Sequence, residues 1–232
     1  MALRILTWNL FHGRSVPHTP RSLLPEFSEL LARWEWDVAL LQEVPPWWPA
    51  PLARATGASM RMALTSRNFL LPVRRAIAER RPDLIKSWGG GSNAILVRGR
   101  AIREHRKRTL RLRPERRVAH GVLLADGIWV TNLHAQGHVE AHARADLELA
   151  AAMTLAWAGA VPTVLGGDLN LRGTPDTPAF EHLAGSGVDH VLGRDVRVTA
   201  KGRTLDRTTV GPERLTLSDH APLTVGIEPA RG

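Results

Sequence analysis

The residues best equipped for chemistry in this chain are Asp219 and His220, which follow a predicted strand over residues 214–217. A carboxylate beside an imidazole can transfer protons and hold anionic groups, although the same pair can also be a structural histidine next to a capping aspartate. Other polar groups follow or end apolar runs that are typical of strands: Asn9 after residues 3–8, Glu43 after 38–41, Asn132 and His134 after 128–131, and Asp168 and Asn170 after 161–165. Five strand ends can therefore converge on one site.

Two of these groups allow more than one interpretation. Gly166 and Gly167 precede Asp168 and Asn170, and glycines allow the backbone to approach a ligand closely. Asp168 and Asn170 then either bind a ligand or cap backbone amides in a turn. Glu43 is either an oxygen ligand for a hard metal ion or a surface glutamate.

Asn132 and His134 lie two positions apart in a predicted strand, so both side chains project to the face opposite Leu133. Two polar groups on one face of an apolar strand indicate a site, and we expect Asn132 to contact substrate. Asn9 either orients a phosphate, supports Glu43, or forms a turn after its strand.

Composition narrows the class of protein. The chain has 232 residues, 44% of them hydrophobic, which is enough for a buried core, and we expect one domain over residues 1–232. It has no cysteine, so a metal ion must bind to oxygen or imidazole, which favours Mg²⁺ or Mn²⁺. We find no leader pattern and no apolar segment of membrane-spanning length, and we expect a cytoplasmic protein without stable membrane insertion.

The charge balance favours an anionic partner. The formal net charge is +9 and the isoelectric point is about 11.4, which suits nucleic acid, a phosphorylated metabolite or an acidic lipid surface. Basic residues concentrate between Arg98 and Arg117. Within that stretch Arg111 and Arg113 alternate with leucines, which predicts a strand with the leucines inward and the arginines outward. The arginines are either substrate contacts that track phosphates or a solvated strand face.

The periodicity predicts more strands than helices and no repeat or linker. The clearest helical pattern runs from His138 to Ala158, and the next from Ser22 to Arg33. A short turn at residues 125–127 suits a hairpin. A pair of mixed sheets with helices outside fits this pattern best. Strands are expected near residues 3–10, 38–41, 94–97, 118–124, 128–133, 161–165, 188–192 and 223–227.

Six short motifs carry a resemblance to a known family. In chain order they are Thr7-Trp8-Asn9-Leu10, Leu41-Gln42-Glu43-Val44, Thr131-Asn132-Leu133-His134, Gly167-Asp168-Leu169-Asn170, Val188-Asp189-His190-Val191-Leu192 and Ser218-Asp219-His220-Ala221-Pro222. With these motifs the chain resembles the endonuclease/exonuclease/phosphatase superfamily of DNase I-like phosphoesterases. The resemblance implies an α/β fold, a four-layer sandwich of two mixed β-sheets flanked by helices, and a metal-dependent phosphoesterase site at one edge.

The resemblance also implies a metal site. Glu43 matches the principal Mg²⁺ ligand of the family, with Asn9 close by and Asp219 as a further metal contact. Mn²⁺ can replace Mg²⁺ at such a site.

The catalytic roles follow from the same resemblance. Asp168 and Asn170 match the residues that hold the attacking water and the phosphate, and Asp189 matches the aspartate that orients His220. His220 is then a general base or a phosphate-stabilising group. His134 either donates a hydrogen bond to a phosphate oxygen or protonates the leaving group.

Some positions depart from the family pattern. Phe11 stands where the abasic-site endonucleases have an aspartate, no arginine follows Glu43, and the chain has no tyrosine at all. We therefore do not expect a specialised DNA-repair role. His12 is either a replacement phosphate contact or a solvated loop residue. Trp47 and Trp48 either stack on a base or sugar or, the reading we favour, belong to the core.

We therefore expect a monomeric Mg²⁺-dependent hydrolase of phosphodiesters, acting on nucleic acid. The alternative is a phosphatase or phosphodiesterase of a small phosphorylated molecule or a phospholipid head group. A non-catalytic nucleic-acid-binding module is the third possibility, which the polar residues retained in all six motifs disfavour.

Overall fold

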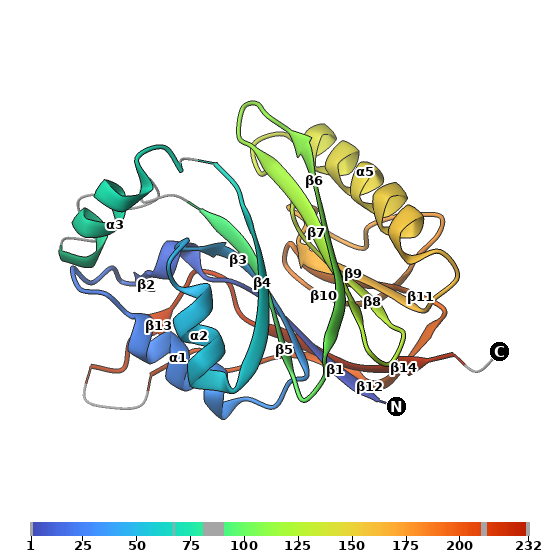
Figure 1. Cartoon of the computed structure of the whole chain (residues 1–232), viewed down its shortest axis with the longest axis horizontal. Coiled ribbons are helices and arrows are strands. Elements are labelled where there is room, and N and C mark those ends of the chain that lie inside the picture. Colours follow the sequence, from blue (N-terminus) through green and yellow to red (C-terminus); the bar gives the residue numbers. More distant parts are fainter. Residues whose placement is uncertain (1, 67, 81–90, 210–212, 231–232) are drawn as a thin grey trace.

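The computed structural model describes residues 2–66, 68–80, 91–209 and 213–230. Two six-stranded sheets pack face to face and carry helices on their outer faces, which confirms the predicted four-layer sandwich (Figure 1). The first sheet has the strand order β12-β14-β1-β3-β5-β4. Its strands are β1 (Leu3–Asn9), β3 (Val38–Val44), β4 (Ala58–Leu64), β5 (Ser92–Arg98), β12 (Val196–Thr204) and β14 (Leu223–Pro229).

The second sheet has the order β10-β11-β9-β8-β7-β6. Its strands β7 and β8 form the antiparallel hairpin predicted around residues 125–127. Both sheets are mixed. The strands are β6 (Ile102–Arg111), β7 (Arg117–Leu124), β8 (Trp129–His134), β9 (Thr163–Asp168), β10 (Glu181–Ser186) and β11 (Asp189–Arg194).

Helices cover the outer faces. Helix α5 (Glu140–Ala158) packs on the second sheet, while α1 (Leu24–Arg33) and α2 (Pro49–Thr56) pack on the first. Helix α3 (Leu71–Arg80) buries none of its residues and lies at the rim of the molecule (Figure 1). A 3-10 turn, η1 (Phe11–Gly13), leads into a short ribbon of β2 (Ser15–Val16) and β13 (Thr216–Leu217).

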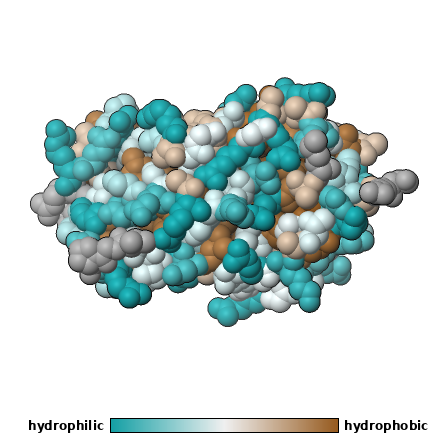
Figure 2. All heavy atoms as spheres, turned by 90° about the horizontal axis from the view of Figure 1, so that it is seen from below, coloured by the Kyte–Doolittle hydropathy of each residue, from teal (hydrophilic) through white to brown (hydrophobic). Residues whose placement is uncertain are grey.

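Three apolar layers stabilise this arrangement. The layer between the sheets is aliphatic, with β-branched residues such as Ile5, Val38 and Val130 alternating along the strands. The layer under α1 and α2 is aromatic, and Trp8 lies 5.0 Å from Phe27. Each fully buried side chain of this size contributes about 1.5–3 kcal/mol relative to an exposed one. The molecular face in Figure 2 is mostly hydrophilic, as expected when the apolar residues lie between the layers.

The strand directions bring the predicted site residues together. Among the described strands, β1 pairs in parallel with β3 and β8 pairs in parallel with β9, while the other sheet pairings are antiparallel. Parallel neighbours end at the same edge of a sheet, where ligands of α/β proteins bind. The pairing of β1 with β3 ends at Asn9 and Gln42, one residue before Glu43, and the pairing of β8 with β9 ends at His134 and Asp168.

Gly167 explains how β8 and β9 approach each other beside Asp168. Its φ of +143° is unfavourable for other residues, and a Cβ atom built there would lie 1.8 Å from the carbonyl oxygen of Leu133. Only glycine fits this position. Gly167 therefore serves the packing of two strands that both carry candidate site residues.

The basic stretch departs from the prediction. Strand β6 ends at Arg111, so residues 112 and 113 do not continue the strand. Leu112 is 73% exposed, whereas the side chain of Arg111 is only 23% exposed because it reaches back to Asp146 of α5. The predicted pattern of inward leucines and outward arginines is therefore wrong for Leu112 and Arg111, although Leu110 does pack against the apolar layer under α5. Among the described helices, none is long and apolar enough to cross a membrane.

Candidate active site

A cleft of about 320 Å³ opens where the parallel strand pairs end. Most of its lining comes from the strand ends and from the turns that follow them. The lining residues are Asn9, Phe11, His12, Arg14, Glu43, Glu115, Arg117, His134, Gly137, His138, Asp168, Asn170, Asp219 and His220.

Glu43 reaches the cleft because its strand is irregular. The register of β3 against β5 shifts between Leu41 and Val44, and Glu43 has a φ of +50°. A bulge of this kind re-aims one side chain of a strand. The Glu43 carboxylate is 22% exposed, and its Oε2 lies 3.1 Å from Nε2 of His12.

Backbone strain concentrates around this cleft. Positive φ angles in residues other than glycine are energetically unfavourable and persist where the surrounding structure enforces them. Glu43 shares this feature with three other cleft residues, Phe11, His12 and Asn170. Such clustering is typical of functional sites.

Asn9 holds Asp168 in place. Its Nδ2 donates to Oδ2 of Asp168 at 2.9 Å, and its Oδ1 accepts the backbone N–H of Phe11 at 2.9 Å. Both ends of this amide are therefore used by the protein. The arrangement suits a residue that orients a carboxylate better than it suits a metal ligand.

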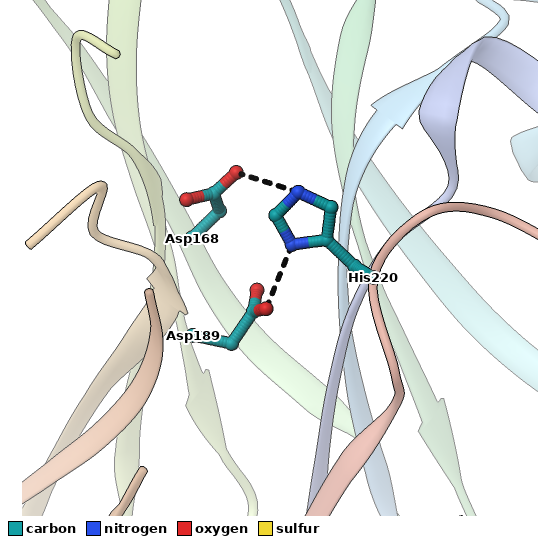
Figure 3. Close-up of side chains that lie close together, drawn as sticks. All are labelled: Asp168, Asp189 and His220. Atoms are coloured by element: carbon teal, nitrogen blue, oxygen red, sulfur yellow. Dashed lines mark hydrogen bonds and ion pairs between the residues drawn. The ribbon is translucent and has the colours of Figure 1, made fainter. Parts of the chain in front are cut away.

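Asp168 and His220 line the cleft and form one group with Asp189 (Figure 3). Nδ1 of His220 lies 2.7 Å from Oδ2 of Asp189, and Nε2 of His220 lies 3.9 Å from Oδ2 of Asp168. The two aspartates are directly paired across β9 and β11. The imidazole is therefore held between two carboxylates.

This arrangement controls the charge of His220. Burial opposes a charge on the ring, but the hydrogen bond and the charge of Asp189 outweigh it and raise the pKa of His220 to about 9. Burial, together with the charge of the neighbouring Asp189, raises the pKa of Asp168. Burial also raises the pKa of Asp189, and the hydrogen bond from His220 opposes that rise. At neutral pH His220 is thus an imidazolium.

The turn before His220 is fixed by Ser218, whose Oγ donates to the carbonyl of Asn9 at 2.6 Å and accepts the N–H of His220 at 3.0 Å. This fixes Asp219 beside the cleft, where its side chain is 47% exposed. On the opposite side, Asn170 donates from Nδ2 to the carbonyl of Ala135 at 2.9 Å, which sets its orientation in the wall.

His134 enters the cleft from the end of β8. Its Nε2 lies 3.5 Å from Oδ2 of Asp168 and 3.9 Å from Oε1 of Glu43, and its Nδ1 lies 3.2 Å from NH1 of Arg117. Burial and the charge of Arg117 lower the pKa of His134 well below its usual value. This imidazole is therefore neutral, in contrast to His220.

Asn132 is placed behind the cleft, and the prediction that it contacts substrate is corrected. It is fully buried, and its Oδ1 accepts from Gln42 while its Nδ2 donates to the carbonyls of Leu41 and Ala94. Gln42 also lies 3.2 Å from the hydroxyl of Thr7. These bonds join the two sheets. We refer to Thr7, Gln42 and Asn132, with the carbonyl groups that they contact, as the inter-sheet seam.

Arg111 and Arg113 also lie outside the cleft lining. The predicted phosphate contact of Arg111 is corrected, because its guanidinium is bonded to Asp146, whereas that of Arg113 stays a prediction. Arg111 bonds to Asp146 at 3.0 Å, and Arg113 is exposed in the loop after β6. The basic stretch divides into separate parts: Arg98 stacks on Trp36 and bonds to three carbonyls, whereas Arg117 enters the cleft.

Several cleft residues were not placed there by the sequence: Phe11, Arg14, Glu115, Arg117, Gly137 and His138, with His12 only as an open alternative. Arg14 lies 3.7 Å over the ring of Phe11 and donates from Nε to the carbonyl of Phe11. Of these cleft residues, only Phe11, His12 and Arg14 could have been found from the sequence, because they lie in the turn at residues 11–14 that directly follows the first strand. Trp48 is core, because it is 4% exposed and packs against Phe27.

Comparisons with known proteins agree with this geometry. The model of the endonuclease/exonuclease/phosphatase family matches residues 6–220, so the chain belongs to that family. Members of this family hydrolyse phosphoester bonds and depend on metal ions. No curated protein matches the sequence.

Solved structures share the fold at low sequence identity. A conserved protein of unknown function from Enterococcus faecalis V583 aligns with a TM-score of 0.73 and 17% identity over 98% of this chain and 100% of that one. Truncated TDP2 from Caenorhabditis elegans aligns at 0.70 and 14%, over 98% and 97%. A mannosyl-6-phosphatase from Bacteroides thetaiotaomicron VPI-5482 aligns at 0.71 and 15%, over 97% and 99%. These likenesses establish the DNase I-like fold.

Proposed function

We propose that this protein is a Mg²⁺-dependent phosphoesterase that hydrolyses phosphodiester bonds, with nucleic acid as its substrate. The observation that carries the proposal is the convergence of Glu43, His134 and Asp168 with the Asp189–His220 pair in one cleft. These groups supply metal-binding oxygens, a cationic imidazole and a neutral imidazole around one position for a phosphate.

The donor set fits a hard cation. Glu43 and Asp219 both line the cleft, both are partly exposed, and both offer carboxylate oxygens, which Mg²⁺ prefers. When bound there, Mg²⁺ would supply charge neutralisation and Lewis-acid polarisation of the phosphate. Mn²⁺ has similar ligand preferences.

A second group also has metal-ligand spacing: the ligand atoms of Asp168, Asp189 and His220 lie within 4.8 Å of one another. We assign this group to proton chemistry instead. Asp189 and His220 are already bonded to each other at 2.7 Å, and a metal on this imidazole would have to displace its proton. Hard cations also prefer oxygen to imidazole.

In the proposed reaction each cleft residue has a separate role. Asn9 orients Asp168, which accepts a hydrogen bond from the attacking water, and Asn170 lies beside the same position. Asp189 favours the imidazolium form of His220, and this positive charge stabilises the phosphate oxygens as negative charge develops. His134 faces the cleft between the carboxylates of Glu43 and Asp168.

Two features bear on the substrate. The net charge of +9 and the arginines Arg14 and Arg117 in the cleft favour a polyanion. The cleft volume of about 320 Å³, however, is also suitable for a small phosphorylated molecule. Because a structural neighbour is a mannosyl-6-phosphatase, a small-molecule phosphatase is the second candidate.

The test is Mg²⁺-dependent hydrolysis of plasmid DNA, single-stranded oligonucleotide, RNA, a generic phosphodiester and a phosphomonoester. Wild type is compared with Glu43→Ala and His220→Ala, with and without chelator. We expect cleavage of nucleic acid by the wild type alone, with a KM that rises steeply with salt. Turnover of the monoester only, with little salt dependence, favours the second candidate. Lack of any turnover contradicts the proposal.

A further inference from the structure

The contact between Arg117 and His134 fixes where the imidazole proton of His134 is. NH1 of Arg117 lies 3.2 Å from Nδ1 of His134. A guanidinium has N–H donors only and no acceptor. Nδ1 must therefore accept this hydrogen bond, so a neutral ring carries its proton on Nε2.

Arg117 is itself held rigidly. Its guanidinium donates from NH2 to Oε2 of Glu115 at 2.7 Å and to Oε1 of Gln136 at 3.2 Å, and the residue is 6% exposed. Gln136 is held in turn, because its backbone N–H donates to the buried Asp146 of α5 at 3.0 Å. A chain of bonds thus runs from the outer helix to the cleft.

Asp146 also explains the position of Arg111. The fully buried Asp146 accepts a hydrogen bond from Nε of Arg111 at 3.0 Å, so β6 and the turn after β8 are both tied to α5. The chain from Asp146 through Gln136 to Arg117 has little freedom to change the direction of its donors. The tautomer of His134 is therefore set by Arg117, which bonds through Gln136 and Asp146 connect to the outer helix.

The other ring nitrogen faces the reaction site. Nε2 of His134 lies 3.5 Å from Asp168 and 3.9 Å from Glu43, on the cleft side of the ring. A neutral Nε2–H is a hydrogen-bond donor of fixed direction, as in other sites where the second imidazole nitrogen sets the tautomer. It is a poor proton donor to a leaving group, because release of its proton would leave an imidazolate.

We propose that Arg117 is a positioning residue that fixes His134 as the Nε2-protonated neutral imidazole, so that His134 donates a hydrogen bond to a phosphate oxygen and does not protonate the leaving group. The tautomer stands on the geometry alone, whereas the assignment to a phosphate oxygen rests on the proposed phosphoesterase function. The two parts are therefore tested separately.

The first experiment measures the tautomer directly by two-bond ¹H–¹⁵N correlation on metal-free protein labelled with ¹⁵N-histidine at pH 7. His134 is assigned by the loss of its signals in His134→Gln. We expect an unprotonated Nδ1 and a protonated Nε2. A proton on Nδ1, alone or in an imidazolium, overturns the proposal. This readout needs no turnover, so it is independent of the proposed function.

Arg117→Met tests the cause of the tautomer. The variant removes the donors while keeping an unbranched apolar stem, and we expect a mixture of the two neutral tautomers. Arg103→Met, an exposed position of β6 outside this network, is the control and should match wild type. If Arg117→Met does not fold, the wild-type spectrum still decides the tautomer. A folded Arg117→Met with unchanged His134 signals overturns the positioning role.

The second experiment compares diesters with good and poor leaving groups, a 4-nitrophenyl and an alkyl phosphodiester. We expect His134→Gln to lower kcat for both by the same factor, within about threefold, because hydrogen bonding to the phosphate acts on both. A much larger loss for the alkyl ester identifies His134 as the leaving-group acid and overturns this part. Absence of wild-type turnover with the expected tautomer contradicts the proposed function but not the positioning by Arg117.

Discussion

Glu43 and His134 line the cleft, whereas Gln42 and Asn132, on the same two strands, belong to the inter-sheet seam. Gln42 precedes Glu43 directly, and Asn132 stands two residues before His134. The seam amides are fully buried and bond across the sheets, while the cleft groups present a carboxylate and an imidazole edge to the cleft. The position of a polar group along a strand therefore decides whether the group bonds across the two sheets or faces the cleft.

The physical reason is access to ligands. A buried amide without partners destabilises a fold, so the seam residues find partners within the protein. At the strand ends the chain turns away and exposes one side of each polar group. The following predictions test this difference, from the largest effect on activity to the smallest.

Glu43→Gln should have the largest effect on turnover. Loss of this carboxylate removes the proposed metal ligand, and metal ions supply several kcal/mol of transition-state stabilisation, so kcat should fall by about a thousandfold or more. Steady-state hydrolysis of a phosphodiester measures this loss. Glu104→Gln, an exposed position of β6, is the control and should retain full activity. A loss of less than tenfold in Glu43→Gln would remove Glu43 from the metal site.

Asp189→Asn should reduce kcat by about a hundredfold, within the usual range for a group that sets the charge of a catalytic imidazole. The neutral amide no longer favours an imidazolium at His220. The pKa of His220, measured by NMR in metal-free protein, should fall below its wild-type value of about 9. An unchanged His220 pKa would show that Asp189 does not control this charge.

The pairing of His220 with Asp189 should also make the stability of the protein depend on pH. The pKa of His220 is raised from 6.5 to about 9 in the folded protein, so its contribution to stability is complete below pH 6.5 and is lost as the pH rises towards 9. Metal-free wild type should therefore lose stability between pH 6.5 and 9 in urea denaturation, relative to His220→Gln. Parallel curves for the two proteins would argue against a charged His220 in the folded state.

Arg14→Ala should act mainly on substrate binding. Arg14 lines the cleft beside Phe11, and a lost charged hydrogen bond is worth about 1.5–3 kcal/mol, so KM should rise about ten- to a hundredfold with kcat nearly unchanged. Arg103→Ala provides the control for loss of a positive charge outside the cleft. Equal effects of the two variants would indicate that only the overall charge matters.

Asn132→Leu should lower the stability of the fold much more than the activity. It removes the bonds to Gln42 and to two backbone carbonyls, and each buried polar group left unpaired costs about 1–3 kcal/mol. Urea denaturation should show lower stability by about 2 kcal/mol or more. The folded fraction should keep kcat within a few-fold of wild type. A large loss of kcat in fully folded protein would contradict the division between seam and cleft.

The sequence predicted the parts of this structure that depend on local pattern. Apolar runs located the central strands, and the polar residues that follow them include Glu43, His134, Asp168 and His220. Strands β4, β10 and β12 were missed because they are short of buried apolar residues: β4 and β10 each bury one residue, and eight of the nine residues of β12 are exposed. Without a buried face, a strand has no periodic signal.

Long-range contacts could not be predicted from single motifs. The bulge that turns Glu43 towards the cleft depends on the pairing of β3 with β5. Asn132 shares its strand face with His134, so periodicity could not tell the seam from the cleft. Arg117 was one of many basic residues in its stretch, and only the fold separates it from Arg111 and Arg113.

The most direct test of the account is Mn²⁺ binding measured by electron paramagnetic resonance, because it locates the metal at the strand ends without requiring a known substrate. Wild type, Glu43→Gln, Asp189→Asn and Asn132→Leu are titrated in parallel. We predict that Glu43→Gln weakens binding at least tenfold, while Asp189→Asn and Asn132→Leu bind as wild type does. Binding that survives in Glu43→Gln and is lost in Asp189→Asn would place the metal on Asp168, Asp189 and His220 and would contradict the account.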